Sequence, residues 1–161
     1  RYCYAGTAVL KNKLGLRDQA ELDAFEALSV AARAEEPLPA GRFSAAHYCA
    51  VHRHLFQDVY GWAGRYRTVR MTKDRSHFCF PENIAAEMRT LFARLQREDL
   101  LRGRRAEDFA AEAAAFLTYL NAIHPFREGN GRSQLTFTAL LAAQAGHPLD
   151  LSRLDPAGFL Q

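Results

Sequence analysis

The chain has 161 residues, of which 48% are hydrophobic and 24% are charged, and these values lie in the range of one ordinary globular domain. They exclude a disordered tail and a collagen-like fibre. The net charge is +3, and the arginines fall in small clusters and form no long basic stripe. This balance suits a phosphate-bearing ligand, and we expect no direct binding to nucleic acid.

Cysteine usage and the N-terminus indicate the compartment. Cys3, Cys49 and Cys79 include no C-x-x-C pair, which favours reduced thiols over a disulfide framework. The sequence contains neither an apolar run long enough to span a membrane nor the apolar region of a signal peptide. We therefore expect a cytoplasmic protein without a membrane partner. Because the chain begins with Arg1, we also expect residues 1–161 to be a single domain of a longer protein.

Hydrophobic periodicity predicts two helices in the first third of the chain. Apolar residues recur at helical spacing over about 18–35, and a proline-containing segment ends that run. Ser44 is a candidate N-cap for a second helix, whose apolar face continues to Trp62. This helix carries a cluster that could also be a metal site, although its members lie on two helical faces and a metal site is therefore disfavoured: His47, Cys49, His52 and His54.

The remaining elements complete a predicted all-α domain. Strand-forming residues over about 66–80 flank a polar turn and predict a short exposed β-hairpin. Pro81 opens a third helix that ends near Arg97, and an alanine-rich fourth helix covers about 106–123. A further helix over about 132–145 is closed by Gly146. The prediction is thus a multi-helix domain with one β-hairpin.

The most informative segment is the loop between the last two helices, residues 124–132. Its glycines permit positive φ angles, so that N–H groups can converge on an anion just before a helix begins. Arg132 can add charge-assisted hydrogen bonds, Glu128 can hold Mg²⁺, and His124 can accept a proton near neutral pH. The sequence therefore predicts a phosphate site formed by Gly129, Asn130, Gly131 and Arg132.

This loop resembles the signature of the Fic family, H-x-F-x-[DE]-G-N-G-R-x-x-R, at seven of its eight fixed positions. The resemblance extends upstream to the His52-x-x-Leu55-Phe56 run and to the predicted hairpin, and so covers most of the chain. The eighth position departs from the signature, because Leu135 replaces the second arginine. In the family that arginine helps orient the γ-phosphate of ATP, and leucine offers neither charge nor donor.

The resemblance implies a Fic fold and a protein adenylyltransferase, which moves AMP from ATP to a Ser, Thr or Tyr hydroxyl. It makes His124 the general base, Glu128 the Mg²⁺ ligand, and Gly129, Asn130, Gly131 and Arg132 the nucleotide-binding group. Phe126 would anchor the loop in the core. The hairpin would act as a flap on which a target protein adds a strand, with Thr72, Lys73 and Phe78 as docking residues.

Regulation and alternatives follow from the same comparison. The inhibitory motif [ST]-x-x-x-E-[GN] of many Fic proteins does not occur in this chain, so an inhibitor would come from an antitoxin-like partner or a flanking segment. A bacterial toxin and an effector translocated into a target cell would look alike over these residues. Two alternatives stay open because of Leu135: a degenerate module that binds nucleotide or a partner without transfer, and an enzyme using a donor for UMP or phosphocholine.

Overall fold

The first helices begin where the sequence supplies a capping side chain. The computed structural model describes residues 2–73 and 76–150. In it, α1 (Gln19–Ala34) follows Asp18, whose carboxylate accepts a hydrogen bond from the N–H of Glu21 at 3.0 Å. The hydroxyl of Ser44 likewise caps α2 (Ala45–Phe56). Both starts agree with the sequence prediction.

The second helix ends earlier than its apolar pattern predicts. It stops at Phe56, whose carbonyl accepts turn hydrogen bonds from the N–H groups of Val59 and Tyr60. Two residues beyond the helix, Asp58 pairs with Arg33 of α1 at 2.6 Å. This tertiary ion pair accompanies a turn that the periodicity alone does not reveal. Trp62 is consequently on an irregular segment and half-buried.

The second half of the chain is almost entirely helical. It contains α3 (Pro81–Arg97), the short 3₁₀ helix η1 (Asp99–Leu101), α4 (Ala106–Ile123) and α5 (Asn130–Ala145). α3 starts with proline, which tolerates the first helical position because its missing N–H would have no partner there. α4 has the predicted bounds. α5 begins two residues before the predicted start, and η1 was not predicted.

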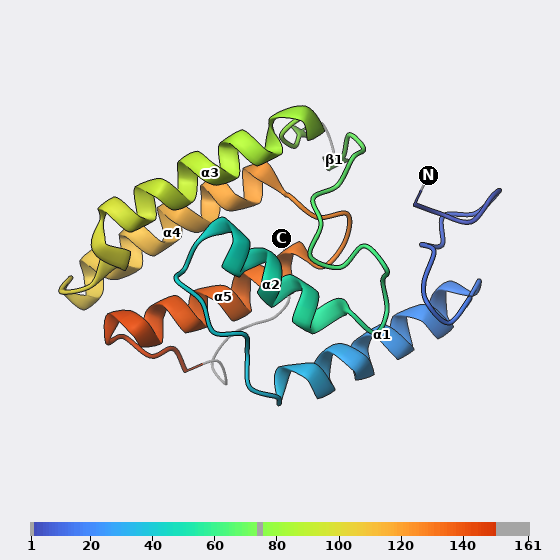
Figure 1. Cartoon of the computed structure of the whole chain (residues 1–161), viewed down its shortest axis with the longest axis horizontal. Coiled ribbons are helices and arrows are strands. Elements are labelled where there is room, and N and C mark those ends of the chain that lie inside the picture. The colour runs from blue at the N-terminus through green and yellow to red at the C-terminus, as the bar shows by residue number, and fades with distance from the viewer. Residues whose placement is uncertain (1, 74–75, 151–161) are drawn as a thin grey trace.

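The helices pack around an aromatic core. Figure 1 shows α3 and α4 side by side, with α5 next to α4, and with α2 between α5 and α1. The buried ring of Phe137 on α5 lies at the centre, at centroid distances of 5.3 Å from Tyr48 and 5.6 Å from Phe92. This arrangement confirms the predicted all-α fold. Over the described residues, no helix is both long and apolar enough to cross a membrane.

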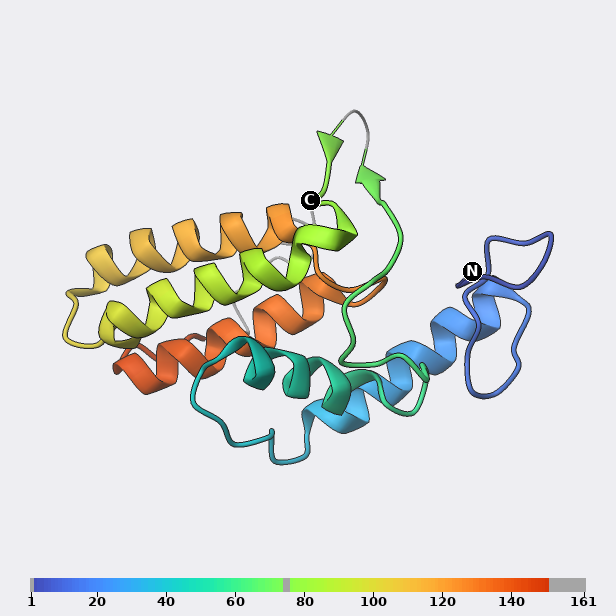
Figure 2. The same ribbon diagram turned by 45° about the horizontal axis from the view of Figure 1, so that its top comes forward.

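The hairpin is much shorter than the run of strand-forming residues. β1 (Thr72–Lys73) and β2 (Ser76–His77) pair antiparallel, with Thr72 opposite His77, and Figure 2 shows them projecting beyond the ends of α3 and α4. The predicted turn includes residues 74–75, which lie outside the described residues. Closer to the core, the N–H groups of Arg67 and Cys79 donate to Pro125 and Ala122 instead of to a facing strand. The last turn of α4 and the connection that follows it therefore replace strand pairing at the base of the hairpin.

Candidate active site

The loop between α4 and α5 is defined by two left-handed residues. His124 ends α4 with φ 48° and ψ 63°, and Gly129 caps the start of α5 with φ 81°. Asn130 and Gly131 already belong to the first turn of α5. The predicted run of positive φ angles is thus restricted to Gly129, and the convergent donors are those of a helix N-terminus.

Asn130 braces this loop from within. Its side-chain oxygen accepts a hydrogen bond from the N–H of Phe126 at 3.0 Å, and its amide nitrogen donates to the Phe126 carbonyl at 2.8 Å. The residue is 3% exposed. The structure thus assigns the Asn130 side chain to the loop backbone, where the sequence predicts a contact with phosphate, and leaves its main chain at the helix N-terminus.

Two phenylalanines hold the loop against the core. Phe126 is fully buried and stacks on Tyr48 with ring centroids 5.4 Å apart, which confirms its predicted anchoring position. Phe56 of α2 lies directly under Gly129, since a Cβ atom added there would be 2.3 Å from Cζ of Phe56. Only glycine fits both this close approach and the left-handed backbone.

The His124 ring is enclosed on one side by the hairpin. The Phe78 ring stacks on it with centroids 3.9 Å apart and an interplanar angle of 13°. Burial, followed by the positive charges of Arg67 and Lys73, lowers the pKa of His124 to about 4. The imidazole is therefore neutral at physiological pH and available to accept a proton.

This pKa predicts an unusual acid limb for any reaction in which His124 is the base. Only the neutral ring accepts a proton, so activity should persist down to a pH near 4 and be lost below it. A histidine with an ordinary pKa would be only about 3% neutral at pH 5. We expect initial rates at pH 5 and pH 7 to be similar, with circular dichroism confirming the fold at each pH. A rate that falls tenfold between pH 7 and pH 5, with the fold intact, would contradict this expectation.

Arg132 is held by a cluster that includes a carboxylate from a distant helix. Its Nη2 atom lies 2.6 Å from Oε1 of Glu26 on α1 and 3.4 Å from Oε1 of Glu128. Glu26 is itself buried and accepts a short hydrogen bond from the Tyr60 hydroxyl. The Arg132 guanidinium also lies 4.7 Å above the Phe56 ring. Both carboxylates contact the same atom, Nη2, and the Arg132 side chain remains about one-third exposed.

Glu128 faces solvent more than its neighbours do. Its side chain is 43% exposed, and Oε1 accepts a hydrogen bond from the N–H of Gly129 at 2.8 Å. Its carbonyl bonds to the imidazole of His52, which is fully buried. Because Nδ1 of His52 accepts from the N–H of Gly64, its Nε2 is the donor to Glu128. His52 thus ties the loop to the segment after α2.

The histidines of α2, for which the sequence disfavours a metal site, point to different partners. His47 bonds to the Pro39 carbonyl and His54 to the Arg33 carbonyl, while His52 points to the loop. Among the described residues, no three His, Cys, Asp or Glu side chains form a group suited to a metal ion. These imidazoles therefore have structural partners of their own.

The docking residues predicted on the hairpin separate into two positions. Thr72 and Lys73 form β1 and are exposed. Phe78 lies just after β2, where its N–H donates to the Met71 carbonyl at 3.2 Å and its ring covers His124. The structure therefore places Phe78 against the candidate base, whereas Thr72 and Lys73 remain on the outer part of the hairpin.

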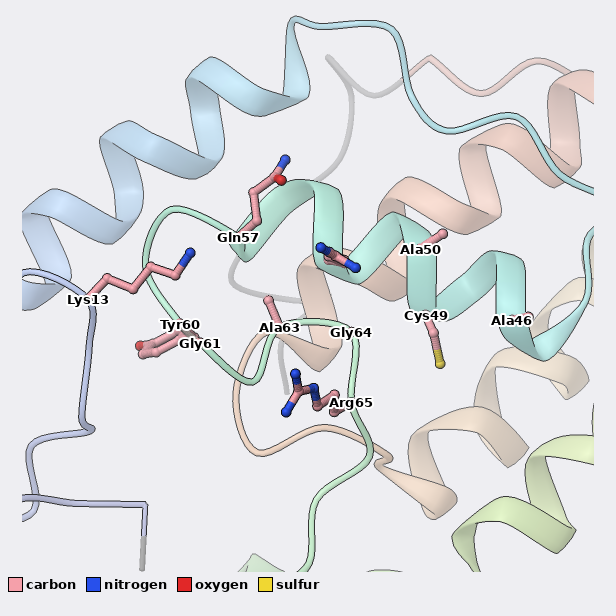
Figure 3. Close-up of a pocket in the computed structure, with 11 residues that line it drawn as sticks. Lys13, Ala46, Cys49, Ala50, Gln57, Tyr60, Gly61, Ala63, Gly64 and Arg65 are labelled. Atoms are coloured by element: carbon pink, nitrogen blue, oxygen red, sulfur yellow. The ribbon is translucent and has the colours of Figure 1, made fainter.

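A separate hollow of about 390 Å³ lies along α2 and the segment that follows it. Figure 3 shows residues that line it, among them Lys13, Cys49, Gly64 and Arg65. Its lining comes from residues outside the 124–132 loop. Gly64 is its connection to the loop, since the N–H of Gly64 bonds to His52.

Comparison with known proteins decides what kind of loop this is. The sequence profile described as the Fic/DOC family matches residues 42–142. The chain belongs to the Fic/DOC family. This match includes α2 to α4 and the loop with its following helix, whereas α1 precedes it.

Sequence relatives in the Fic/DOC family carry names of one activity. The chain is 52% identical over 159 residues to a protein of Sinorhizobium fredii named probable protein adenylyltransferase y4lH. This match covers 98% of this chain and 83% of that protein. It is 39% identical over 152 residues to protein adenylyltransferase VbhT of Bartonella schoenbuchensis. That match covers 92% of this chain but only 32% of VbhT.

Solved Fic-domain structures share the architecture. A BepC effector of Bartonella tribocorum, crystallised with bound AMPPNP, has 31% identity and a TM-score of 0.86 over 97% of this chain and 83% of that one. The Fic domain of a Bep effector from Bartonella sp. AR 15-3 has 29% identity and a TM-score of 0.91 over 99% of this chain and 79% of that one. The Fic fold is thus shared from α1 onward, beyond the profile match.

Proposed function

We propose that this chain is a protein adenylyltransferase that moves AMP from ATP to a Ser, Thr or Tyr hydroxyl of a target protein. The observation that carries this proposal is the juxtaposition of a neutral histidine, His124, with the N-terminus of α5 across a five-residue connection. One end of this loop can accept a proton, and the other can bind phosphate. The names of the relatives and the nucleotide analogue in BepC support the same activity.

In this reaction the target hydroxyl attacks the α-phosphorus of ATP. His124 accepts the hydroxyl proton, a bond forms between that oxygen and the α-phosphorus, and the bond to the bridging oxygen breaks to release pyrophosphate. N–H groups in the first turn of α5, including that of Gly131, stabilise the charge on the transferred group, whereas the Gly129 N–H is engaged by Glu128. The partly exposed Arg132 guanidinium binds the β-phosphate. The Asn130 side chain contributes by keeping the loop in shape.

Glu128 is the proposed ligand for Mg²⁺. Mg²⁺ in nucleotide sites is usually held by one or two carboxylates together with the phosphates, and this chain offers one exposed carboxylate beside the phosphate position. The donor set therefore fits the ion. When bound, Mg²⁺ neutralises charge on the phosphates, while His52 and the Gly129 N–H keep Glu128 oriented.

The hairpin is the proposed docking site for the target protein. An added strand would bond to the exposed backbone of β1, with Thr72 and Lys73 beside it. Phe78 then packs beneath, on His124. We further propose that an antitoxin-like protein inhibits the enzyme in trans, because the chain lacks the glutamate motif of intrinsic inhibition. Translocation as a bacterial effector is consistent with the Bep relatives.

The test of this function is mass spectrometry of a bacterial lysate incubated with the purified protein, Mg²⁺ and ATP. We expect one AMP adduct on a hydroxyl side chain of a target protein. Parallel reactions contain UTP or CDP-choline. An adduct from UTP or CDP-choline alone, with none from ATP, would show that the enzyme transfers UMP or phosphocholine instead of AMP. The absence of an adduct from all three donors would favour a module that binds without transfer.

Leu135 predicts weak discrimination between ATP and ADP. It lies three residues after Arg132 on α5 and supplies no group for the γ-phosphate. We expect the two nucleotides to bind within about threefold of each other, and Leu135→Arg to tighten ATP about tenfold while leaving ADP unchanged, since a charge-assisted hydrogen bond contributes about 1.5 kcal/mol or more. Isothermal titration calorimetry with both nucleotides measures this. Equal tightening of ATP and ADP would show that residue 135 does not face the γ-phosphate.

A further inference from the structure

Arg67 is a buried arginine whose partners are all main-chain carbonyls. It is 1% exposed, and its guanidinium donates to the carbonyls of His124 and Val69 at 2.7 and 2.6 Å. The third nitrogen donates to Cys79 at 2.6 Å and to Ile123 at 3.2 Å. Each of the three guanidinium nitrogens is therefore engaged. No carboxylate is among these acceptors in the described part of the chain.

These acceptors belong to two different parts of the site. Val69 and Cys79 lie on the two legs of the hairpin, before β1 and after β2. Ile123 and His124 form the end of α4, where carbonyls that lack a partner within the helix carry partial negative charge. The backbone of Arg67 adds a hydrogen bond from its N–H to the Pro125 carbonyl at 2.8 Å. One side chain thus joins both legs of the hairpin to the residue that carries the base.

Burying the guanidinium of Arg67 costs desolvation free energy, and its hydrogen bonds to four carbonyls offset this cost. A buried charge is tolerated only where hydrogen bonds satisfy it, and a smaller lysine ammonium could not reach four carbonyls spread over three chain segments. The guanidinium fork matches them because its donors are fixed in one plane. Its removal would leave the hairpin legs held to this region only by main-chain bonds such as that from Cys79 to Ala122, and would leave buried carbonyls without donors.

We propose that Arg67 is the positioning residue that fixes the hairpin relative to the imidazole of His124. The inference rests on the proposed function, in which a target strand on the hairpin presents a hydroxyl to that imidazole. In this proposal Arg67 contacts neither ATP nor the target protein. It sets the separation between the docking strand and the base through the backbone, and a displacement of about 1 Å between reacting groups can reduce a rate about 100-fold.

Arg67 also acts on His124 as a charge. The charged groups that lower the pKa of His124 are Arg67 and, from the hairpin, Lys73. A lysine at position 67 keeps a positive charge and loses the fork, whereas methionine removes both. The two variants therefore separate the geometric contribution from the electrostatic one.

The experiment compares Arg67→Lys and Arg67→Met with the wild-type protein, and Arg65→Lys is the control because Arg65 is exposed two residues earlier. For Arg67→Lys we expect kcat for target modification to fall 10- to 100-fold, the Kd for ADP to stay within twofold, and the His124 pKa measured by NMR to remain low. For Arg67→Met we expect that pKa to rise. Amide hydrogen exchange at Cys79 should accelerate in both variants, because its N–H donates to the Ala122 carbonyl where the hairpin meets the end of α4.

Parallel losses of ADP binding and target modification in Arg67→Lys would overturn the proposal in favour of a general folding role. An unchanged kcat in a folded Arg67→Lys variant would overturn it as well, because the hairpin would then be positioned without the guanidinium. Arg67→Lys keeps the test usable if Arg67→Met does not fold. If the wild-type protein transfers no AMP, the proposed function fails. The NMR titration and the exchange rates then still decide whether Arg67 tethers the hairpin to His124.

Discussion

Replacing His124 by alanine is expected to lower kcat for AMP transfer by about 10²- to 10⁴-fold, the usual contribution of a general base. The rings of His47, His52 and His54 are already engaged, because each has its Nε2 atom on a backbone carbonyl. ATP binding should change little, since the phosphate contacts come from the start of α5. Initial rates with a purified target and calorimetry with ADP measure the two effects separately.

His147→Ala is the matched control for this variant. His147 lies beyond the opposite end of α5, where its ring packs at a tilt against Phe109 and bonds to the Arg104 carbonyl. It should retain AMP transfer at the wild-type level. A rate for His124→Ala within threefold of wild type would remove the histidine from the reaction and leave only its structural place at the end of α4.

Gly129→Ala should cause the largest loss of stability in the loop. The added methyl carbon would lie 2.3 Å from the Phe56 ring, on a backbone with φ 81°. Left-handed strain and overpacking together predict a decrease in the free energy of unfolding of about 2–5 kcal/mol. We expect nucleotide binding to be lost as well, because the N-terminus of α5 must shift. Chemical denaturation and calorimetry with ADP test both expectations.

Gly146→Ala separates backbone strain from the steric clash. Gly146 caps the other end of α5 with φ 85°, and an added Cβ there meets nothing within 4 Å. Only the conformational cost of about 1–2 kcal/mol remains, and nucleotide binding should be normal. If the two variants were equally destabilised, the close approach of Phe56 to Gly129 would not be the cause.

Local patterns were sufficient for most helices and for the chemical groups of the loop. The bounds predicted for α4 agree with the structure, and Ser44 and Pro81 mark the starts of α2 and α3 correctly, because capping and periodicity act within a few residues. The hairpin was overpredicted. At its base, the N–H groups of Arg67 and Cys79 have their partners at Pro125 and Ala122, which are distant in sequence.

The supporting residues of the site were missed for the same reason. Glu26 looks like one more charged residue on α1, and Arg67 looks like one of several scattered arginines. Their roles depend on partners more than 50 residues away in the chain, such as Arg132 and His124. A buried charge leaves no periodic signal in a single sequence, so only the fold shows which charged residues are enclosed.

The contact between Glu26 and Arg132 bears on where this domain can be cut. The family profile starts at residue 42, after α1. A fragment that begins there would retain the whole signature loop but would lose Glu26. The carboxylate of Glu26 pairs with Arg132 and accepts a hydrogen bond from the Tyr60 hydroxyl. The functional boundary therefore lies before Gln19, and the smallest autonomous unit is longer than its recognisable signature.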